Sequence, residues 1–189
     1  MLKSLKYYKK LSKTITKQPI FVFYNNKLRV LMFISMAFIR FINASETYPL
    51  RIKILRNGQA ERYKFEQDHN ASTFHLGAFS HDTCVGIATF LKANQPYFQD
   101  QQNIYQLRGM AVDATFQSQG IGRQLMTFAF GELTKRNSSL LWCNARQHAI
   151  GFYRNMGFQT TGEEFIVPHI GPHIVMFKDL RRETGVGSL

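Results

Sequence analysis

Two glycines, one residue apart, stand at the entrance to a predicted helix. The stretch GMAVDATFQSQGIGRQLM, residues 109–126, starts as an apolar strand and ends in a helical pattern, with Gly120 and Gly122 between the two. The first N–H groups of a helix lack intrahelical partners, and the helix dipole adds partial positive charge, so phosphate groups bind there. Because glycines keep side chains away from the backbone, the spacing predicts a phosphate site at residues 117–123.

Two common nucleotide-binding motifs do not fit this loop. A P-loop requires Lys and then Ser or Thr after its last glycine, but Arg123 and Gln124 follow Gly122. A Rossmann fingerprint requires a third glycine where this chain has Leu125. A plain glycine turn between a strand and a helix is the structural alternative. The loop therefore suits a phosphate group without indicating either nucleotide-binding class.

The elements around the loop predict an α+β, or mixed α/β, fold with helices on the faces of the sheet. Apolar runs and turn signals predict strands at residues 38–43, on both sides of His81 and Asp82 within 72–93, and at 104–113, 139–145, 158–166 and 173–179. Helical patterns cover residues 50–55, capped by Ser45 or Thr47, then 120–136 and 147–158, the last ended by Gly157. Residues 59–71 are polar and predict a loop.

The positive charge of the chain is concentrated near its N-terminus. The 189 residues fit one domain, and 44% of them are hydrophobic, as is usual for a globular protein. The net charge is +12, but residues 1–40 hold nine of the 24 Lys and Arg and none of the twelve Asp and Glu. The remaining residues carry only +3. We therefore expect no nucleic-acid-binding surface on the folded domain.

We expect residues 1–35 to be a basic and apolar extension, followed by one domain over residues 36–189. The longest uncharged stretch, Val30–Ile39, has ten residues, whereas a membrane-spanning helix needs about 20, so stable membrane insertion is not expected. A secretory signal and a basic, aromatic anchor at a membrane surface stay open. The favoured alternative is translated sequence upstream of a natural start at Met36, where the charge balance becomes ordinary.

The two cysteines do not indicate a metal site. Cys84 and Cys143 each lie in an apolar run, and neither has a Cys or His at metal-ligand spacing. Two buried free thiols in a reducing compartment are the favoured interpretation. A disulfide or a catalytic thiol is the alternative, and no metal is expected.

The order of strand, Gln-x-x-Gly-x-Gly loop and helix resembles the acyl-CoA site of the GNAT superfamily of N-acetyltransferases. The downstream elements of that family are also present, as the strand LLWCN, then Ala149-x-x-x-Tyr153 and Gly157-Phe158. The resemblance covers residues 36–180, and the ending EEFIVPHIGPHIVM is similar to a bacterial subgroup of unassigned substrate. It implies the GNAT-type fold, a central, mostly antiparallel mixed sheet flanked by helices. It also implies acetyl-CoA as co-substrate, an amine acceptor, a cytoplasmic location and a monomer or homodimer.

The resemblance further implies how the coenzyme binds. Its pyrophosphate would lie on the N–H groups of the glycine loop, and its pantetheine arm would pair with the edge of the MAV strand. The chain departs from the family at Gln117, where Arg is common, and at Arg146, where Asn is common; Asn144 is a candidate replacement. The cofactor-binding residues implied are Met110, Ala111, Val112, Gln117, Ser118, Gln119, Gly120, Ile121, Gly122, Arg123, Asn144, Ala149 and Tyr153.

The resemblance also assigns catalytic roles. A neutral amine would attack the thioester, an N–H of Met110 or Val112 would stabilise the oxyanion, and Tyr153 would protonate the departing thiolate. A core aromatic is the alternative for Tyr153. For the base, His173 and Glu163 are favoured over other members of the closing strands, which are Glu164 and His169. The other function classes are a non-catalytic acyl-CoA-binding module and a basic-tailed RNA or membrane binder.

Overall fold

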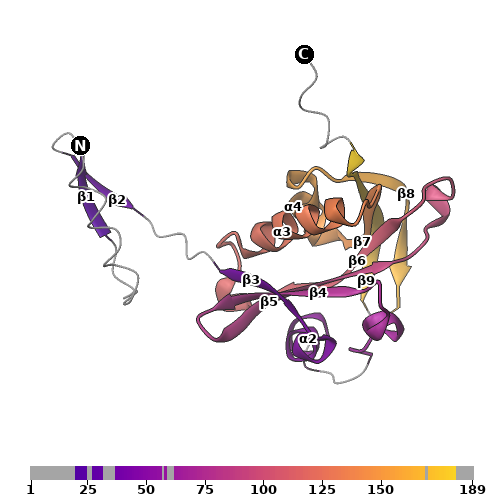
Figure 1. Ribbon diagram of the computed structural model, residues 1–189, viewed down its shortest axis with the longest axis horizontal. Coiled ribbons are helices and arrows are strands. Elements are labelled where there is room, and N and C mark those ends of the chain that lie inside the picture. Colours follow the sequence, from indigo (N-terminus) through magenta and orange to yellow (C-terminus); the bar gives the residue numbers. More distant parts are fainter. Residues whose placement is uncertain are drawn as a thin grey trace, which may run out of the picture. The chain divides into compact units, whose positions relative to one another are not determined.

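The chain divides into two compact units, residues 1–35 and residues 36–189. The computed structural model describes residues 20–24, 27–31, 37–56, 58, 62–168 and 170–181. In the first unit, β1 (Ile20–Tyr24) and β2 (Lys27–Leu31) form an antiparallel pair (Figure 1). Most of the predicted extension, the predicted start at Met36, and His169 lie outside the described residues.

The second unit is built on one seven-stranded sheet with the order β3-β4-β5-β6-β7-β9-β8 (Figure 1). All neighbouring strands are antiparallel except β6 and β7, which are parallel. This mixed sheet confirms the predicted fold class. The strands are β3 (Phe38–Ile42), β4 (Phe74–Ser80), β5 (Thr83–Lys92), β6 (Ile104–Val112), β7 (Leu140–Arg146), β8 (Gln159–Val167) and β9 (Gly171–Asp179).

Helices cover both faces of this sheet (Figure 1). On one face lie α3 (Ile121–Lys135) and α4 (Ile150–Asn155), and on the other lies α2 (Ala44–Leu50), which continues as a π-helix over Arg51–Leu55. Neighbouring residues of a strand point to opposite faces. Consequently the β5 neighbours Ile87 and Ala88 belong to different cores, the first on the α2 side and the second on the α3 side.

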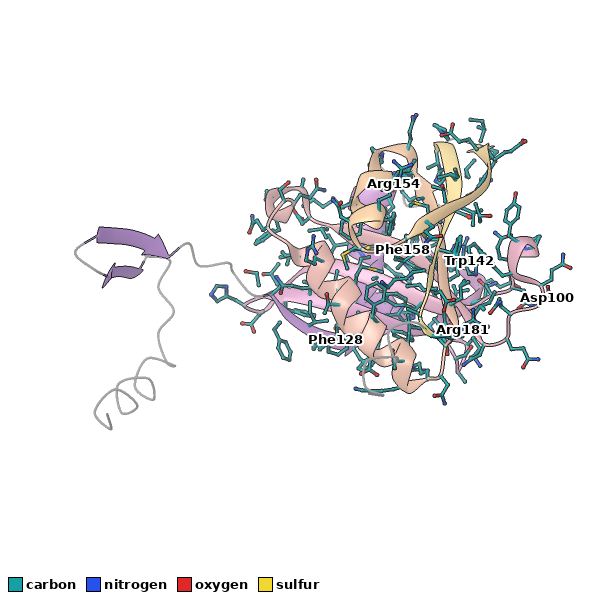
Figure 2. All side chains as sticks on the ribbon, turned by 90° about the horizontal axis from the view of Figure 1, so that it is seen from above. Asp100, Phe128, Trp142, Arg154, Phe158 and Arg181 are labelled. Carbon is teal, nitrogen blue, oxygen red and sulfur yellow. The ribbon has the colours of Figure 1, made fainter. Side chains whose placement is uncertain are left out.

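A third apolar cluster lies at β7 and β9, around Trp142 (Figure 2). The Trp142 indole Nε1 donates a hydrogen bond to the Ala93 carbonyl at 2.9 Å, which ties the connector after β5 to this end of the sheet. The same connector carries Phe98, whose ring lies 5.0 Å from that of Phe177 on β9. These contacts give Trp142 a structural role.

Two local predictions were wrong. The first helix begins at Ala44 rather than at Ser45 or Thr47, because the Glu46 carboxylate accepts the Asn43 N–H at 2.8 Å and so caps an earlier turn. The region predicted as a polar loop contains a 3-10 helix over Glu66–His69. There the neighbouring Phe65 and Asp68 are buried, at 7% and 4% exposure.

Candidate active site

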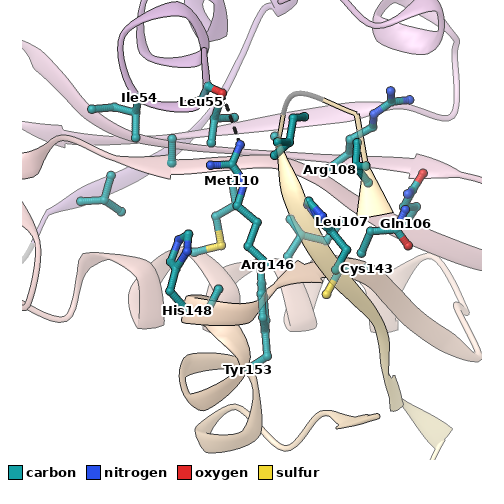
Figure 3. A pocket seen from close by; sticks show the side chains of 18 of the residues that line it. Ile54, Leu55, Gln106, Leu107, Arg108, Met110, Cys143, Arg146, His148 and Tyr153 are labelled. Atoms are coloured by element: carbon teal, nitrogen blue, oxygen red, sulfur yellow. Dashed lines mark hydrogen bonds between the residues drawn. The ribbon is translucent and has the colours of Figure 1, made fainter. Parts of the chain in front are cut away.

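The parallel strands β6 and β7 pair over three residues only and then diverge. Ile104–Gln106 lie opposite Leu140–Trp142, and beyond them each strand continues without pairing to the other. A cleft of about 680 Å³ lies between the diverging halves (Figure 3). The facing edge of β6 therefore leaves backbone groups free to pair with an extended ligand, as a further strand would.

A bulge at Gly109 bends β6 where the two strands separate. The register of β5 and β6 shifts between Ile87 and Thr89, so two residues of β6 oppose one of β5. Gly109 has φ +67°, and a Cβ there would lie 2.8 Å from the Phe65 ring. Both its positive φ and this close approach require glycine at the bulge. The bulge increases the local bend of β6 and so helps to open the cleft.

The backbone of Val112 faces the cleft. The next residue, Asp113, donates its N–H to the Val85 carbonyl on β5 at 2.8 Å. Since backbone groups alternate in direction along an antiparallel strand, the N–H and carbonyl of Val112 point the other way. The Gln117 side chain confirms this direction, because its Nε2 donates to the Val112 carbonyl at 3.0 Å. Met110, two residues earlier, lines the same cleft.

After β6, a 3-10 turn at Ala114–Phe116 leads into the glycine loop and α3. The first intrahelical hydrogen bond of α3 runs from the Gln124 N–H to the Gly120 carbonyl at 3.0 Å. The N–H groups before Gln124 precede the hydrogen-bond ladder and form an anion site. The Gln117 N–H is not part of this set, because it already donates to the Ala114 carbonyl at 3.4 Å. The set at the first turn comprises the N–H groups of Ile121, Gly122 and Arg123.

The two glycines of the loop have different roles. Gly120 caps α3 with φ +79°, in the left-handed region, and a Cβ there would meet open space. Gly122 has ordinary helical geometry, but a Cβ would lie 3.2 Å from Phe152 and 3.3 Å from Met110. From the sequence, both glycines were expected to give a phosphate access to the backbone. In the structure the second also lets the first turn of α3 pack closely against α4 and β6.

Replacing Gly120 by Ala should destabilise the loop and weaken coenzyme binding. A non-glycine residue in the left-handed region costs about 1–2 kcal/mol, so denaturant unfolding should show a loss of that size. The matched control is Gly131→Ala in α3, where a Cβ meets nothing within 4 Å. That change should stabilise the protein by about 0.5–1 kcal/mol and leave calorimetric CoA affinity unchanged. Equal CoA affinity in both variants would contradict a role for the loop in coenzyme binding.

Tyr153 enters the cleft from α4 (Figure 3). Its side chain is buried, with 9% exposure, and burial raises the pKa of its phenol well above the ordinary value. The neighbouring Cys143 thiol also lines the cleft, and burial raises its pKa too. At neutral pH both groups are therefore protonated. Tyr153 can donate a proton to an anion that forms in the cleft.

His173 lines the cleft from β9, opposite Arg146 of β7. Its Nδ1 lies 2.9 Å from the Gly171 carbonyl, and its ring stacks on Phe165 with a centroid distance of 6.0 Å. Because a carbonyl oxygen only accepts, the neutral imidazole carries its proton on Nδ1. The Nε2 lone pair then remains available to take a proton. A histidine in this state can act as a general base.

The other favoured base, Glu163, is not brought into the cleft. It is exposed on β8, where the register with β9 shifts between Thr161 and Phe165, and it is not among the lining residues. Glu164 is exposed on the same segment. The irregular pairing turns this segment toward solvent. Among the described candidates for the base, the structure places His173 alone in the cleft.

Apart from Glu163, the predicted site residues fall into two neighbouring groups. Eight line the cleft: Met110, Ala111, Val112, Gln117, Asn144, Ala149, Tyr153 and His173. Six follow directly in the glycine loop and the first turn of α3: Ser118, Gln119, Gly120, Ile121, Gly122 and Arg123. Asn144 is exposed at the wall of the cleft, whereas Arg146 is half-buried and donates from Nη2 to the Leu55 carbonyl at 3.2 Å (Figure 3).

Sequence analysis missed a buried ion pair beside the cleft. Arg51 donates from Nη1 and Nη2 to the two carboxylate oxygens of Asp68, at 2.7 and 2.9 Å, and both side chains are 1% exposed. The Arg51 guanidinium also lies over the ring of Phe65, 3.9 Å from its centroid, and Phe65 lines the cleft. The available signal was an arginine between the apolar Leu50 and Ile52 of a short helix.

Three further predictions concern the cysteines, metals and membranes. Cys84 and Cys143 are both free thiols, as expected, although Cys84 is only partly buried. Within the described part of the chain, no group of three or more His, Cys, Asp or Glu side chains is placed to hold a metal ion. None of the helices described there is long and apolar enough to cross a membrane.

Solved structures with this architecture define the class of fold. Escherichia coli ElaA superposes with a TM-score of 0.58 at 20% identity, over 76% of this chain and 100% of ElaA. An acyl-CoA N-acyltransferase from Pseudomonas aeruginosa reaches a TM-score of 0.61 at 17% identity, over 75% of this chain and 99% of that protein. An aminoglycoside 6'-N-acetyltransferase in complex with coenzyme A reaches 0.58 at 16% identity, over 76% and 97%. The fold is that of the acyl-CoA N-acyltransferases, as predicted.

Sequence comparison identifies the family. The model of the acetyltransferase (GNAT) family matches residues 40–158. The uncharacterized N-acetyltransferase YitI of Bacillus subtilis (strain 168) is 39% identical over 144 residues, which cover 76% of this chain and 96% of YitI. The chain therefore belongs to the GNAT family of acetyltransferases. The predicted family and the predicted enzyme class, an acyltransferase, are confirmed.

Proposed function

We propose that this enzyme transfers the acetyl group of acetyl-CoA to a primary amine of a small molecule or protein, by direct attack in a ternary complex. The observation that carries the proposal is the cleft between β6 and β7, which has Tyr153 and His173 in its lining and the free N–H groups of α3 beside it. We place the enzyme in the cytoplasm, where acetyl-CoA is available.

The backbone supplies most of the coenzyme site. The pyrophosphate lies on the N–H groups at the start of α3, where the helix dipole favours negative charge. The pantetheine arm pairs with the exposed edge of β6 at Val112, whose N–H and carbonyl face the cleft. Gln117 exchanges its own hydrogen bond to the Val112 carbonyl for one to the coenzyme. The thioester then lies near the bulge at Gly109.

The reaction follows from the groups around the thioester. An alkylammonium ion has a pKa of about 10, so His173 Nε2 removes a proton from it, directly or through water. The amine nitrogen attacks the thioester carbon, and the Met110 N–H stabilises the oxyanion; one such donor typically lowers the barrier by about 3–4 kcal/mol. When the C–S bond breaks, its electron pair goes to sulfur, and Tyr153 protonates the thiolate. The attacking nitrogen gives its second proton to the Tyr153 phenolate, directly or through water, so the products are CoA and the neutral acetylated amine.

Acetyl-CoA turnover tests this function directly. The full chain is incubated with acetyl-CoA and a panel of amines, and the released thiol is measured together with the acetylated product. We expect CoA release that requires an amine. Coenzyme binding with no thiol release for any amine would instead support a non-catalytic acyl-CoA-binding module. The presence of Tyr153 in the lining of the cleft favours the enzyme over that alternative.

Replacing His173 by Asn tests which of the two candidate bases, His173 or Glu163, removes the proton from the amine. Loss of a general base typically lowers the rate about 10²–10⁴-fold, so kcat should fall by at least about 100-fold while CoA binding persists. Glu163→Gln is the matched control, because Glu163 is exposed and outside the cleft lining. It should leave kcat within about two-fold, as expected for a surface substitution. A larger loss in Glu163→Gln than in His173→Asn would reassign the base.

A further inference from the structure

Three arginines from different elements line the cleft. Arg56 follows the π-helix, Arg108 lies on β6 and Arg146 ends β7, and all three line the cleft. Figure 3 shows Arg108 and Arg146 there. They are separated by up to 90 residues in the sequence. The fold therefore brings three permanently charged guanidinium groups to one ligand-sized space.

Their contacts hold these side chains in place without neutralising them. Arg56 donates from Nη2 to the Arg62 carbonyl at 3.2 Å, and Arg146 donates to the Leu55 carbonyl at 3.2 Å. The Arg108 guanidinium lies over the Phe65 ring, 4.2 Å from its centroid. These partners are uncharged. Each contact uses only part of the five N–H donors that a guanidinium carries.

No carboxylate balances these charges within the described structure. None of Arg56, Arg108 and Arg146 forms an ion pair there, and the cleft lining contains neither Asp nor Glu. The nearby buried carboxylate, Asp68, has both oxygens bonded to Arg51. Burial, and then repulsion from Arg146 and Arg108, lowers the pKa of Arg56, which is the expected response to converging positive charge.

An anion bound in this cleft would receive charge-assisted hydrogen bonds. The guanidinium fork matches the geometry of a carboxylate or a phosphate, often with two parallel bonds. A cationic acceptor would instead meet like charges on every side. The same positive field lowers the pKa of an acceptor ammonium group and so assists its deprotonation by His173. The site thus favours an acceptor that carries both an amine and an oxyanion.

We propose that the acceptor is a small anionic amine, with a carboxylate or phosphate group a few bonds from the reacting nitrogen, held by Arg56, Arg108 and Arg146. This proposal rests on the proposed acetyl transfer and specifies its substrate class. The amine lies toward His173 and the thioester, and the oxyanion lies against the arginines.

Matched pairs of amines test the proposal through acetyl-CoA turnover. The pairs are γ-aminobutyrate with butylamine, tyrosine with tyramine, and phosphoethanolamine with ethanolamine, so that carboxylate and phosphate are separate arms. A hydrogen-bonded charged group is worth about 1.5–3 kcal/mol, so kcat/KM should be about 10–150-fold higher for the anionic member of at least one pair. Equal rates within all pairs, or a higher kcat/KM for the members that lack the carboxylate or phosphate, would overturn the proposal.

Variants show whether the arginines produce this preference. For each pair of amines, the preference is the kcat/KM of the member with the carboxylate or phosphate divided by that of the member without it. Arg108→Gln and Arg146→Gln should each reduce this ratio by about ten-fold or more. The matched control is Arg154→Gln, because Arg154 is exposed on α4 and does not line the cleft (Figure 2). It should leave the ratio unchanged. A ratio that stays the same in Arg108→Gln and Arg146→Gln would also overturn the proposal.

A binding measurement separates this proposal from the proposed function. With the protein saturated with CoA, which occupies the phosphate loop, glutarate or inorganic phosphate should raise the unfolding temperature of the wild type and of Arg154→Gln. Neither anion should do so in Arg108→Gln combined with Arg146→Gln. Anion binding without turnover of any amine would retain the arginine site and reject acetyl transfer. If the wild type turns over an amine but neither anion raises its unfolding temperature, acetyl transfer is retained and the arginine site is rejected.

Discussion

Replacing Tyr153 by Phe should lower kcat by about 100-fold or more, because in the proposed mechanism the departing thiolate loses its proton donor. The buried phenol is held in its protonated form by desolvation, which raises its pKa well above the ordinary value. A group in that state can donate a proton at neutral pH but cannot act as the base. The ring remains in Tyr153→Phe, so its packing against Phe152 and Phe158, with centroids at 5.2 and 5.4 Å, is preserved.

The control for this variant is Tyr105→Phe. Tyr105 is also buried, at 2% exposure, and lies on β6, but it packs in the core and does not line the cleft. We expect normal kcat in Tyr105→Phe, and CoA affinity equal to that of wild type in both variants by calorimetry. Stopped-flow measurement of thiol release isolates the chemical step. If Tyr153→Phe retains the wild-type rate in that step, the departing thiolate is protonated by another donor, such as water.

Removing one partner of the buried Arg51–Asp68 pair should have the largest effect on stability. Breaking a buried ion pair leaves an uncompensated charge and typically costs about 3–5 kcal/mol, so Asp68→Asn should lose about that much in urea unfolding. The pair also lies beside Phe65, and Arg51 donates to Thr89 on β5 at 2.7 Å. Loss of the ion pair should therefore loosen the part of the cleft wall that contains Phe65.

The stability that Asp68 contributes should depend on pH. Burial by itself would raise its pKa, but the hydrogen bonds from Arg51 and the Phe65 N–H hold the pKa below the ordinary value. A carboxyl whose pKa is lower in the folded state stabilises the fold above its unfolded-state pKa, and loses that contribution as the pH falls through the folded value. The difference in the free energy of unfolding between wild type and Asp68→Asn should therefore be largest at neutral pH and decrease as the pH falls into the acid range.

An exposed ion pair serves as the control for this prediction. Lys135 and Glu132 form a pair on α3 in which the lysine side chain is 73% exposed. Surface pairs of this kind contribute about 0.3–0.5 kcal/mol, so Lys135→Gln should change the free energy of unfolding by no more than that. If Asp68→Asn costs no more than Lys135→Gln, the buried pair is not a stabilising element of the wall.

Much of the fold was predictable because its signals are local. The hairpin at His81 and Asp82, the helix after Gly120 and the helix end at Gly157 each depend on neighbouring residues, through apolar periodicity or through glycine at positive φ. The glycine loop likewise follows from the few residues between a strand and a helix. The structure places this loop directly after β6 and at the start of α3, as the sequence predicted.

The choice between candidate bases required the tertiary structure. His173 and Glu163 lie in adjacent, paired strands, and both residue types can take a proton. Only the irregular register of β8 against β9 decides that Glu163 is exposed while His173 faces the cleft. Register between strands depends on contacts along their whole length and has no signature in a single residue.

By itself, then, the sequence of this protein determined the order of its elements, the family and the glycine loop between β6 and α3, since each is encoded in short spacings. The tertiary structure alone decided where β6 and β7 diverge, that Arg51 is buried against Asp68, and that Arg56, Arg108 and Arg146 meet in one cleft. Those features join residues far apart in the chain. Their positions are set by the packing of the whole domain, which no local pattern of residues records.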